Sequence, residues 1–284
     1  MPQLYVRVPR YRPPPLACDA HCHVFGPAAR FPYAGSRAYT PEDAPKEQLA
    51  ALHQALGFER AVIVQASCHG TDNSAMLDAI AASGGRYRGV AIVDDSLGDA
   101  GYASLHERGV RGVRFNFVKH LGGMPDPAVV TRVVERVRPL GWHVVVHLDA
   151  VDIADLSPLL RRLPTPFLID HMGRVKAAGG LDQPAFKALL DLMALDRCWV
   201  KVCGAERVSS QGPPFHDAIP FAQALIARAP DRVLWGTDWP HPNVGPNAPN
   251  DGDLVDLLPL IAPDPGNRNA LLVTNPMRLY DFNS

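Results

Sequence analysis

The feature of this 284-residue sequence that most constrains its fold is a repeated alternation of short apolar runs with helix-length segments. Most of the runs are unbroken and rich in β-branched residues, which is typical of parallel strands buried on both faces. We expect strands at residues 16–21, 60–66, 88–93, 110–115, 142–148, 166–171, 199–203 and 233–237. Helical patterning between them includes residues 46–56, 73–82, 127–140, 152–163 and 215–229. Eight such units predict an α/β fold, the (β/α)8 or TIM barrel.

We expect the whole chain, residues 1–284, to form a single barrel domain. Barrels of this kind commonly run to ~250 residues, and no linker, repeat or low-complexity tract divides the sequence. Residues 25–44 form a long loop with proline and aromatic residues, and long loops in compact domains are often functional lids. Residues 268–280 are expected to pack as a closing helix.

Composition argues against several classes of protein. The formal net charge of -1 gives no general electrostatic attraction to nucleic acid or to an anionic membrane. No run approaches the ~20 apolar residues of a membrane span, and the first 15 residues lack the apolar centre of a secretory signal. The five cysteines are odd in number and contain no CxxC pair, so a disulfide framework is not expected. We expect a soluble, cytoplasmic protein.

Four of the expected strands end in histidine or aspartate. His21 and His23 follow the first strand, His147 ends the fifth, His171 ends the sixth and Asp238 follows the eighth. Side chains two apart on a strand point the same way, so both N-terminal histidines should point into the barrel. Strand ends of a parallel barrel meet at one mouth, so these groups should converge there. Asp238 is the expected general base; a turn or capping aspartate is the alternative.

The same residues raise the question of a metal ion. Imidazole and carboxylate groups are the ligands that zinc prefers, and a catalytic site keeps one position open for water. One divalent metal, zinc, could therefore be held by His21, His23, His147, His171 and Asp238. In the alternative, no metal is bound and the histidines polarise a carbonyl group themselves. Residue types alone leave both possibilities open.

Three arginines are candidates for binding an anionic substrate. Arg114 ends the fourth strand, and Arg174 and Arg207 follow the sixth and seventh. A guanidinium group can bind a carboxylate through two parallel hydrogen bonds. A surface ion pair is the alternative for each. Arg111 should face the helices by strand alternation and is not a candidate.

The loop after the second strand offers further polar groups. Ser67 and His69 could donate hydrogen bonds to a substrate, whereas Asp72 or Asn73 is expected to cap the next helix. Cys68 lies between the two donors. The sequence shows no arrangement that would activate it as a nucleophile.

Six segments together resemble a known family. They are AHCHVFGP (20–27), VIVQASCHGTDN (62–73), RGVRFNF (111–117), IDHMGR (169–174), WGTDWPHPN (235–243) and TNPMRLY (274–280). The chain resembles the amidohydrolase superfamily in its lactonase branch, most closely the 2-pyrone-4,6-dicarboxylate lactonases. The resemblance implies a distorted barrel and hydrolysis of a cyclic ester in aromatic-compound catabolism.

The resemblance also implies roles for particular residues. It implies that Asp238 takes a proton from the attacking water. The groups that polarise the lactone carbonyl are then His21, His23 and His171. Side chains at positions that match substrate contacts are Tyr39, Ser67, Arg114, Arg174 and Arg207.

Two positions depart from the family pattern. His147 stands where the pyrone lactonases have tyrosine, and a metal is therefore possible again. His120 stands where they have a second arginine, six residues after the first. Both histidines are expected to contact substrate. The resemblance and these departures imply as substrate 2-pyrone-4,6-dicarboxylate or a related anionic lactone, such as a muconolactone or sulfomuconolactone.

Two other functions remain open. A zinc-dependent decarboxylase of the same superfamily would share the histidine and aspartate ligands, although RGVRFNF and QASCHGTDN favour the lactonase. A barrel that only binds an anionic aromatic metabolite is disfavoured, because the expected base and carbonyl-polarising groups are all present. The expected partner is a small anionic lactone rather than nucleic acid or a membrane, and the chain could form a homodimer.

Overall fold

The computed structural model describes residues 6–245 and 248–282 and contains a parallel eight-stranded sheet in the order β1 to β8. Its strands are β1 (Cys18–Cys22), β2 (Arg60–Val64), β3 (Tyr87–Ala91), β4 (Val110–Asn116), β5 (His143–His147), β6 (Phe167–Ile169), β7 (Cys198–Lys201) and β8 (Val233–Leu234). Backbone hydrogen bonds also join the last strand to the first, from Ala20 N to Trp235 O (2.9 Å) and from Asp238 N to His21 O (2.8 Å). The sheet is a nearly closed TIM barrel, as predicted.

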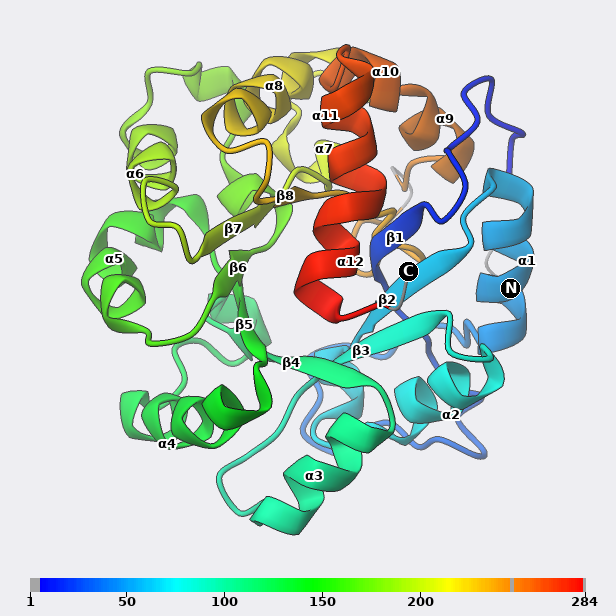
Figure 1. Cartoon of the computed structure of the whole chain (residues 1–284), viewed down its shortest axis with the longest axis vertical. Coiled ribbons are helices and arrows are strands. Elements are labelled where there is room, and N and C mark those ends of the chain that lie inside the picture. Colours follow the sequence, from blue (N-terminus) through cyan, green and yellow to red (C-terminus); the bar gives the residue numbers. More distant parts are fainter. Residues whose placement is uncertain (1–5, 246–247, 283–284) are drawn as a thin grey trace.

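Helices alternate with the strands and cover the outside of the barrel (Figure 1). They are α1 (Lys46–Leu56), α2 (Ser74–Ala82), α3 (Asp99–Glu107), α4 (Pro127–Val137), α5 (Ile153–Arg162), α6 (Pro184–Leu192), α7 (Ala205–Val208) and α8 (Ile219–Arg228). In the described part of the chain after β8 there are four more: α9 (Asp251–Asp256), α10 (Leu258–Ile261), α11 (Pro265–Asn269) and α12 (Asn275–Tyr280). No helix within these described residues is both long and apolar enough to cross a membrane.

The C-terminal segment closes one end of the barrel. In Figure 1 the strands surround α12, drawn in red. Tyr280 is fully buried and belongs to the inner core, with residues such as Val62, Val145 and Leu168 from the strands. Phe282 lies under the guanidinium groups at the start of two strands, Arg60 and Arg88. The predicted closing helix is therefore present and plugs the amino-terminal mouth, so the opposite mouth is left for chemistry.

The first strand contains an irregularity that aims the N-terminal histidines. Between Asp19 and Cys22 the strand advances three residues while its partner β2 advances two, from Ala61 to Ile63. One extra residue of this kind reverses the inward and outward alternation. Cys18 and Ala20 belong to the inner core before this point, whereas Cys22 packs in the outer core after it. His21 and His23 consequently face inward, as predicted.

The predicted element boundaries differ from the observed ones mainly at the ends. Strands β6 and β8 have three and two residues, shorter than the predicted runs 166–171 and 233–237. The predicted helix 127–140 is α4 followed by a separate 3₁₀ turn at Arg138–Leu140. His171, at the end of the predicted run 166–171, belongs to a 3₁₀ turn (His171–Arg174) rather than to the strand.

The buried His143 at the start of β5 provides a test of acid stability. Burial and the positive charge of Lys201 lower the pKa of His143 to about 3, compared with ~6.5 in an unfolded chain. Between pH ~6.5 and about 3, this histidine is protonated in the unfolded chain but not in the native protein. The free energy of unfolding therefore decreases as the pH falls through this range. Over this interval the free energy of unfolding falls by about 5 kcal/mol. We expect His143→Leu to shift the acid-unfolding midpoint to lower pH, measured by circular dichroism.

The control for this experiment is the exposed residue His216, substituted in the same way. His216→Leu should leave the midpoint near that of the unsubstituted protein. An identical midpoint in His143→Leu would show that His143 does not contribute to acid unfolding.

Candidate active site

Three imidazole rings surround one carboxylate oxygen at the carboxyl-terminal mouth of the barrel. Asp238 Oδ1 lies 3.4 Å from His21 Nε2, 3.2 Å from His23 Nε2 and 3.9 Å from His171 Nε2. All four side chains are at most 2% exposed. The backbone hydrogen bonds between the first strand and the segment after β8 bring these groups together. The predicted convergence of strand ends is therefore present.

The charge on Asp238 is stabilised by an arginine. Arg207 donates to Asp238 Oδ2 from Nε, at 2.9 Å, and from Nη2. Burial alone would raise the pKa of Asp238, but Arg207, His171 and the other imidazoles hold it well below its usual range. Asp238 is thus ionised at neutral pH, with Oδ1 directed towards the histidines. A general base has to be ionised before it can accept a proton.

Two of the neighbouring histidines, His21 and His171, are kept neutral by their burial. Burial is the largest cause lowering the pKa of His171 well below its usual value, and it also lowers that of His21 to about 4. His171 Nδ1 lies 3.5 Å from the thiol of Cys203, a weak donor, which favours a proton on Nε2. His23 Nδ1 lies 2.7 Å from the carbonyl of Val64 and must donate to it.

A second layer of contacts holds His147. Its Nδ1 lies 3.0 Å from Asn116 Oδ1, and its Nε2 lies 3.3 Å from Arg174 Nη1, which can only donate. Arg174 in turn pairs with Asp149, at 3.0 Å from Nε to Oδ1. Burial, followed by the charge of Arg114, lowers the pKa of His147 well below its usual value. His147 is thus a neutral ring whose Nε2 lone pair is directed at an arginine.

Arg114 is anchored before any substrate arrives. Its Nε and Nη2 lie 3.2 and 3.1 Å from Asp170 Oδ2. Asp170 is fully buried, yet Lys201, His21 and Arg114 hold its pKa well below the usual range against the effect of burial. The guanidinium group is therefore fixed in orientation, which lowers the entropy cost of binding an anion with its remaining N–H donors.

These side chains line one pocket. Most of the predicted site residues contribute to its wall: His23, Tyr39, Ser67, Arg114, His120, His147, His171, Arg174, Arg207 and Asp238. His21 lies beneath them, against Asp238. Burial raises the pKa of Tyr39 well above its usual value, so its hydroxyl remains a donor at neutral pH. The predicted lid loop contributes Tyr39 to this wall.

His69 is a correction to the predicted set. It lies in the turn Ser67–His69 and, unlike Ser67, is not among the residues that line this pocket. Its Nδ1 lies 3.2 Å from the carbonyl oxygen of Pro32, and its ring packs 4.7 Å from that of Tyr33. Side chains of one tight turn point in different directions, so Ser67 lines the pocket while His69 contacts the 25–44 loop. Arg111, as predicted, lies outside the site and donates to the His106 carbonyl.

The backbone is strained where it carries the site. His171, Arg174 and Asp238 have φ values of 52°, 52° and 64°, in the left-handed region that costs side-chain-bearing residues energy. At Gly236 an added Cβ would lie 2.4 Å from the His21 nitrogen, so only glycine permits this approach. The surrounding barrel therefore holds the site in a conformation that the local chain would not choose.

Three buried charged groups of the site were not anticipated as functional. They are Lys201 and Asp170, described above, and Glu206, whose side chain is 1% exposed. Glu206 Oε1 lies 3.3 Å from Arg207 Nε, and burial followed by the charge of Asp238 raises the pKa of Glu206. Lys201 had a recognisable signal, since it is the one charged residue of the run Cys198–Lys201.

The donor groups match a metal in type but not in charge. Among the described residues, four groups have potential ligand atoms within 4.8 Å of one another, and two of these groups contain the site histidines: His21, His23 and Asp238, and His21, Asp170 and His171. Neither includes His147. Lys201 Nζ lies 2.8 Å from His21 Nδ1, and Arg207 holds the other oxygen of Asp238. Two cations already stabilise the ligands, so the arrangement fits a divalent ion poorly.

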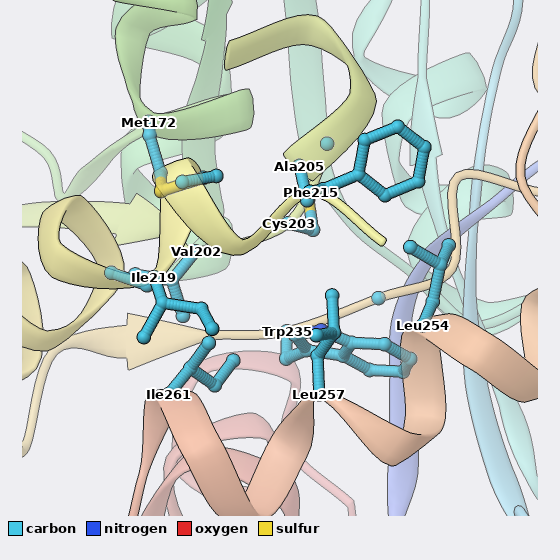
Figure 2. A pocket seen from close by; sticks show the side chains of 14 residues that line it. Met172, Val202, Cys203, Ala205, Phe215, Ile219, Trp235, Leu254, Leu257 and Ile261 are labelled. Atoms are coloured by element: carbon cyan, nitrogen blue, oxygen red, sulfur yellow. The ribbon is translucent and has the colours of Figure 1, made fainter. Parts of the chain in front are cut away.

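A second cavity lies behind the site, between the segments that follow β7 and β8 and the helices α8–α10 (Figure 2). Apolar side chains such as Met172, Phe215, Trp235 and Leu257 form most of its wall. Cys203, the neighbour of His171, also borders it, and burial raises the pKa of its thiol well above the usual value. This lining offers no charged partner for an anion, so the cavity is a gap in packing rather than a substrate site.

Comparison with known proteins agrees with this geometry. The amidohydrolase family model matches residues 18–282. A 2-pyrone-4,6-dicarboxylate hydrolase of Comamonas testosteroni is 49% identical over 281 residues, 96% of this chain and 92% of that one. A 4-sulfomuconolactone hydrolase of Hydrogenophaga intermedia is 43% identical over 282 residues, 98% and 93% of the two chains. A crystal structure from Pseudomonas putida has a TM-score of 0.84 and 35% identity, covering 95% and 98%. The chain belongs to the amidohydrolase family.

Proposed function

We propose that the protein is a lactonase that opens the ring of an anionic lactone, with water activated by Asp238. The observation that carries the proposal is the ionised, buried Asp238 facing three imidazoles at the floor of an arginine-lined pocket. The named activities of the relatives support it, since both act on lactones that carry acidic groups.

Each step of the reaction has a group suited to it. Asp238 Oδ1 accepts a proton from water while the water oxygen bonds to the lactone carbonyl carbon. N–H groups of the neighbouring imidazoles, His171 Nε2 among them, donate to the oxyanion that develops. When the ring C–O bond breaks, Asp238 returns the proton to the ring oxygen. Preorganised donors of this kind stabilise the charge that appears in the transition state.

The pocket wall indicates the class of substrate. Arg114 and Arg174 offer fixed positive charge, and His120, Tyr39 and Ser67 offer further hydrogen-bonding groups. Arg207, also a predicted substrate contact, directs its donors to Asp238 and to the Pro242 carbonyl. We therefore assign substrate anions to Arg114 and Arg174 first. A dianionic lactone, either a pyrone dicarboxylate or a sulfonated muconolactone, fits this charge.

A substrate panel tests the proposal. Purified protein is assayed with 2-pyrone-4,6-dicarboxylate, 4-sulfomuconolactone and δ-valerolactone, a neutral lactone. Ring opening is followed by absorbance, and released acid by pH-stat titration. We expect turnover of an anionic lactone with one proton released per ring opened. Carbon dioxide release without ring opening would indicate the decarboxylase, and calorimetric binding without turnover would indicate a binding protein.

The same preparation tests the role of a metal. We expect turnover to persist after chelation, in protein whose zinc content is far below one ion per chain, because Arg207 and Lys201 already supply positive charge. Elemental analysis and activity before and after chelation measure this. Activity that disappears with the chelator and returns in proportion to added zinc would establish a catalytic metal instead.

A further inference from the structure

Lys201 is a fully buried lysine inside the barrel, directly beneath the site. It ends β7, its side chain is 0% exposed, and its Nζ lies 2.8 Å from His21 Nδ1 and 3.2 Å from Asp170 Oδ1. Lysine is almost never fully buried without a paired partner, because removing its charge from water is costly. Asp170 balances the charge, but it does not explain why the ammonium group also lies against an imidazole.

The contact decides which nitrogen of His21 carries the proton. An ammonium group donates and cannot accept, so at 2.8 Å His21 Nδ1 has to be the acceptor. An imidazolium ring has a proton on both nitrogens and could not accept this hydrogen bond, so the contact requires a neutral ring. A neutral imidazole whose Nδ1 accepts carries its proton on Nε2. That nitrogen faces Asp238 and the floor of the pocket.

Asp170 favours the other tautomer of His21, with the proton on Nδ1. Its Oδ1 lies 3.3 Å from His21 Nδ1 and would accept a proton from it if Lys201 were absent. In the native protein Lys201 is nearer to that nitrogen, and Arg114 shares the charge of Asp170. The balance between the two tautomers therefore depends on a single ammonium group.

We propose that Lys201 is a positioning residue that keeps the proton of His21 on Nε2, so that this ring donates to the developing oxyanion. The kinetic consequence rests on the proposed lactone hydrolysis, whereas the tautomer itself does not. With the proton on Nε2, that nitrogen has no lone pair for a metal, and His21 is a poor zinc ligand. Removing Lys201 should therefore weaken hydrolysis and strengthen zinc binding together.

The test compares Lys201→Met with the unsubstituted protein. The ring nitrogens of His21 are observed by ¹⁵N NMR and assigned with a His21→Asn variant. We expect the proton on Nε2 in the unsubstituted protein and on Nδ1 in Lys201→Met. We also expect kcat on 2-pyrone-4,6-dicarboxylate to fall about tenfold with KM little changed, because one hydrogen bond must be rearranged. Zinc chloride should bind at least tenfold more tightly.

Two further variants separate this role from a structural one. Lys201→Arg keeps a donor at the position and should keep the proton on Nε2. Val200→Ala removes packing from the same strand and should leave the tautomer and zinc affinity unchanged while lowering thermal stability. A loss of activity in Lys201→Met without tighter zinc binding would point to a structural role and overturn the proposal.

The outcomes distinguish this inference from the proposed function. A proton on His21 Nδ1 in the unsubstituted protein overturns the inference, and that spectrum decides even if Lys201→Met fails to fold. An unchanged tautomer in a folded Lys201→Met overturns it as well. If the tautomer switches as expected but no lactone is hydrolysed by the unsubstituted protein, the positioning role stands and the proposed lactonase activity fails.

Discussion

Replacing Asp238 with asparagine should lower kcat by roughly 10²–10⁴-fold, the usual contribution of a placed general base. Asparagine keeps the shape of the side chain but cannot accept the proton of the attacking water. The three imidazoles remain, so the carbonyl is still polarised and some residual turnover is expected. Steady-state kinetics on the best anionic lactone of the panel measures the effect.

A matched control distinguishes the loss of the catalytic base from the loss of one negative charge elsewhere on the protein. Asp231 lies in the exposed turn before β8, and its side chain is 59% exposed, so Asp231→Asn should leave kcat unchanged. Asp238→Asn loses the ion pair with Arg207, so its thermal midpoint and its affinity for the lactone must be measured alongside kcat. A folded variant with near-normal turnover would rule out Asp238 as the base.

Replacing Arg114 with methionine should lower kcat/KM for a dianionic lactone by roughly ten- to over a hundred-fold. The estimate follows from a charge-assisted hydrogen bond of about 1.5–3 kcal/mol. Arg114 lines the pocket and is held in place by Asp170, so it meets the substrate in one orientation. For an uncharged lactone the loss should be much smaller, because no anion is there to bind.

Arg111 provides the control for this substitution on the same strand. Arg111→Met removes the same charge three residues away, where the guanidinium donates to a backbone carbonyl outside the pocket. It should leave the preference for charged substrates unchanged. Equal losses on charged and neutral lactones in Arg114→Met would count against direct anion recognition and would indicate that Arg114 acts through Asp170.

Much of the architecture could be predicted because it depends on local patterns. Buried parallel strands require unbroken apolar runs, and eight of these with helical segments between them allow few folds other than a barrel. The predicted strands correspond one to one with β1–β8. The carboxyl ends of the strands meet at one mouth of such a barrel. The proximity of four residues could therefore also be predicted: His21, His23, His171 and Asp238.

The partners within the site could not be predicted, because they depend on the distances between strands. One extra residue in β1 turns His21 and His23 inward, and only the pairing with β2 reveals it. Arg207 was predicted to bind an anionic substrate because it is an arginine. In the structure it donates to Asp238 and keeps this carboxylate ionised.

The direction and the burial of individual side chains also depend on the tertiary structure. His69 and Ser67 are two residues apart in one turn, but only Ser67 faces the pocket. The sequence shows that Lys201 is a charged residue in a predicted strand. Only the tertiary structure shows that its Nζ lies next to His21 Nδ1. The sequence by itself determined the barrel and the residue types at its mouth. The tertiary structure decided protonation, pairing and orientation, because these depend on distances of a few ångströms between residues far apart in the chain.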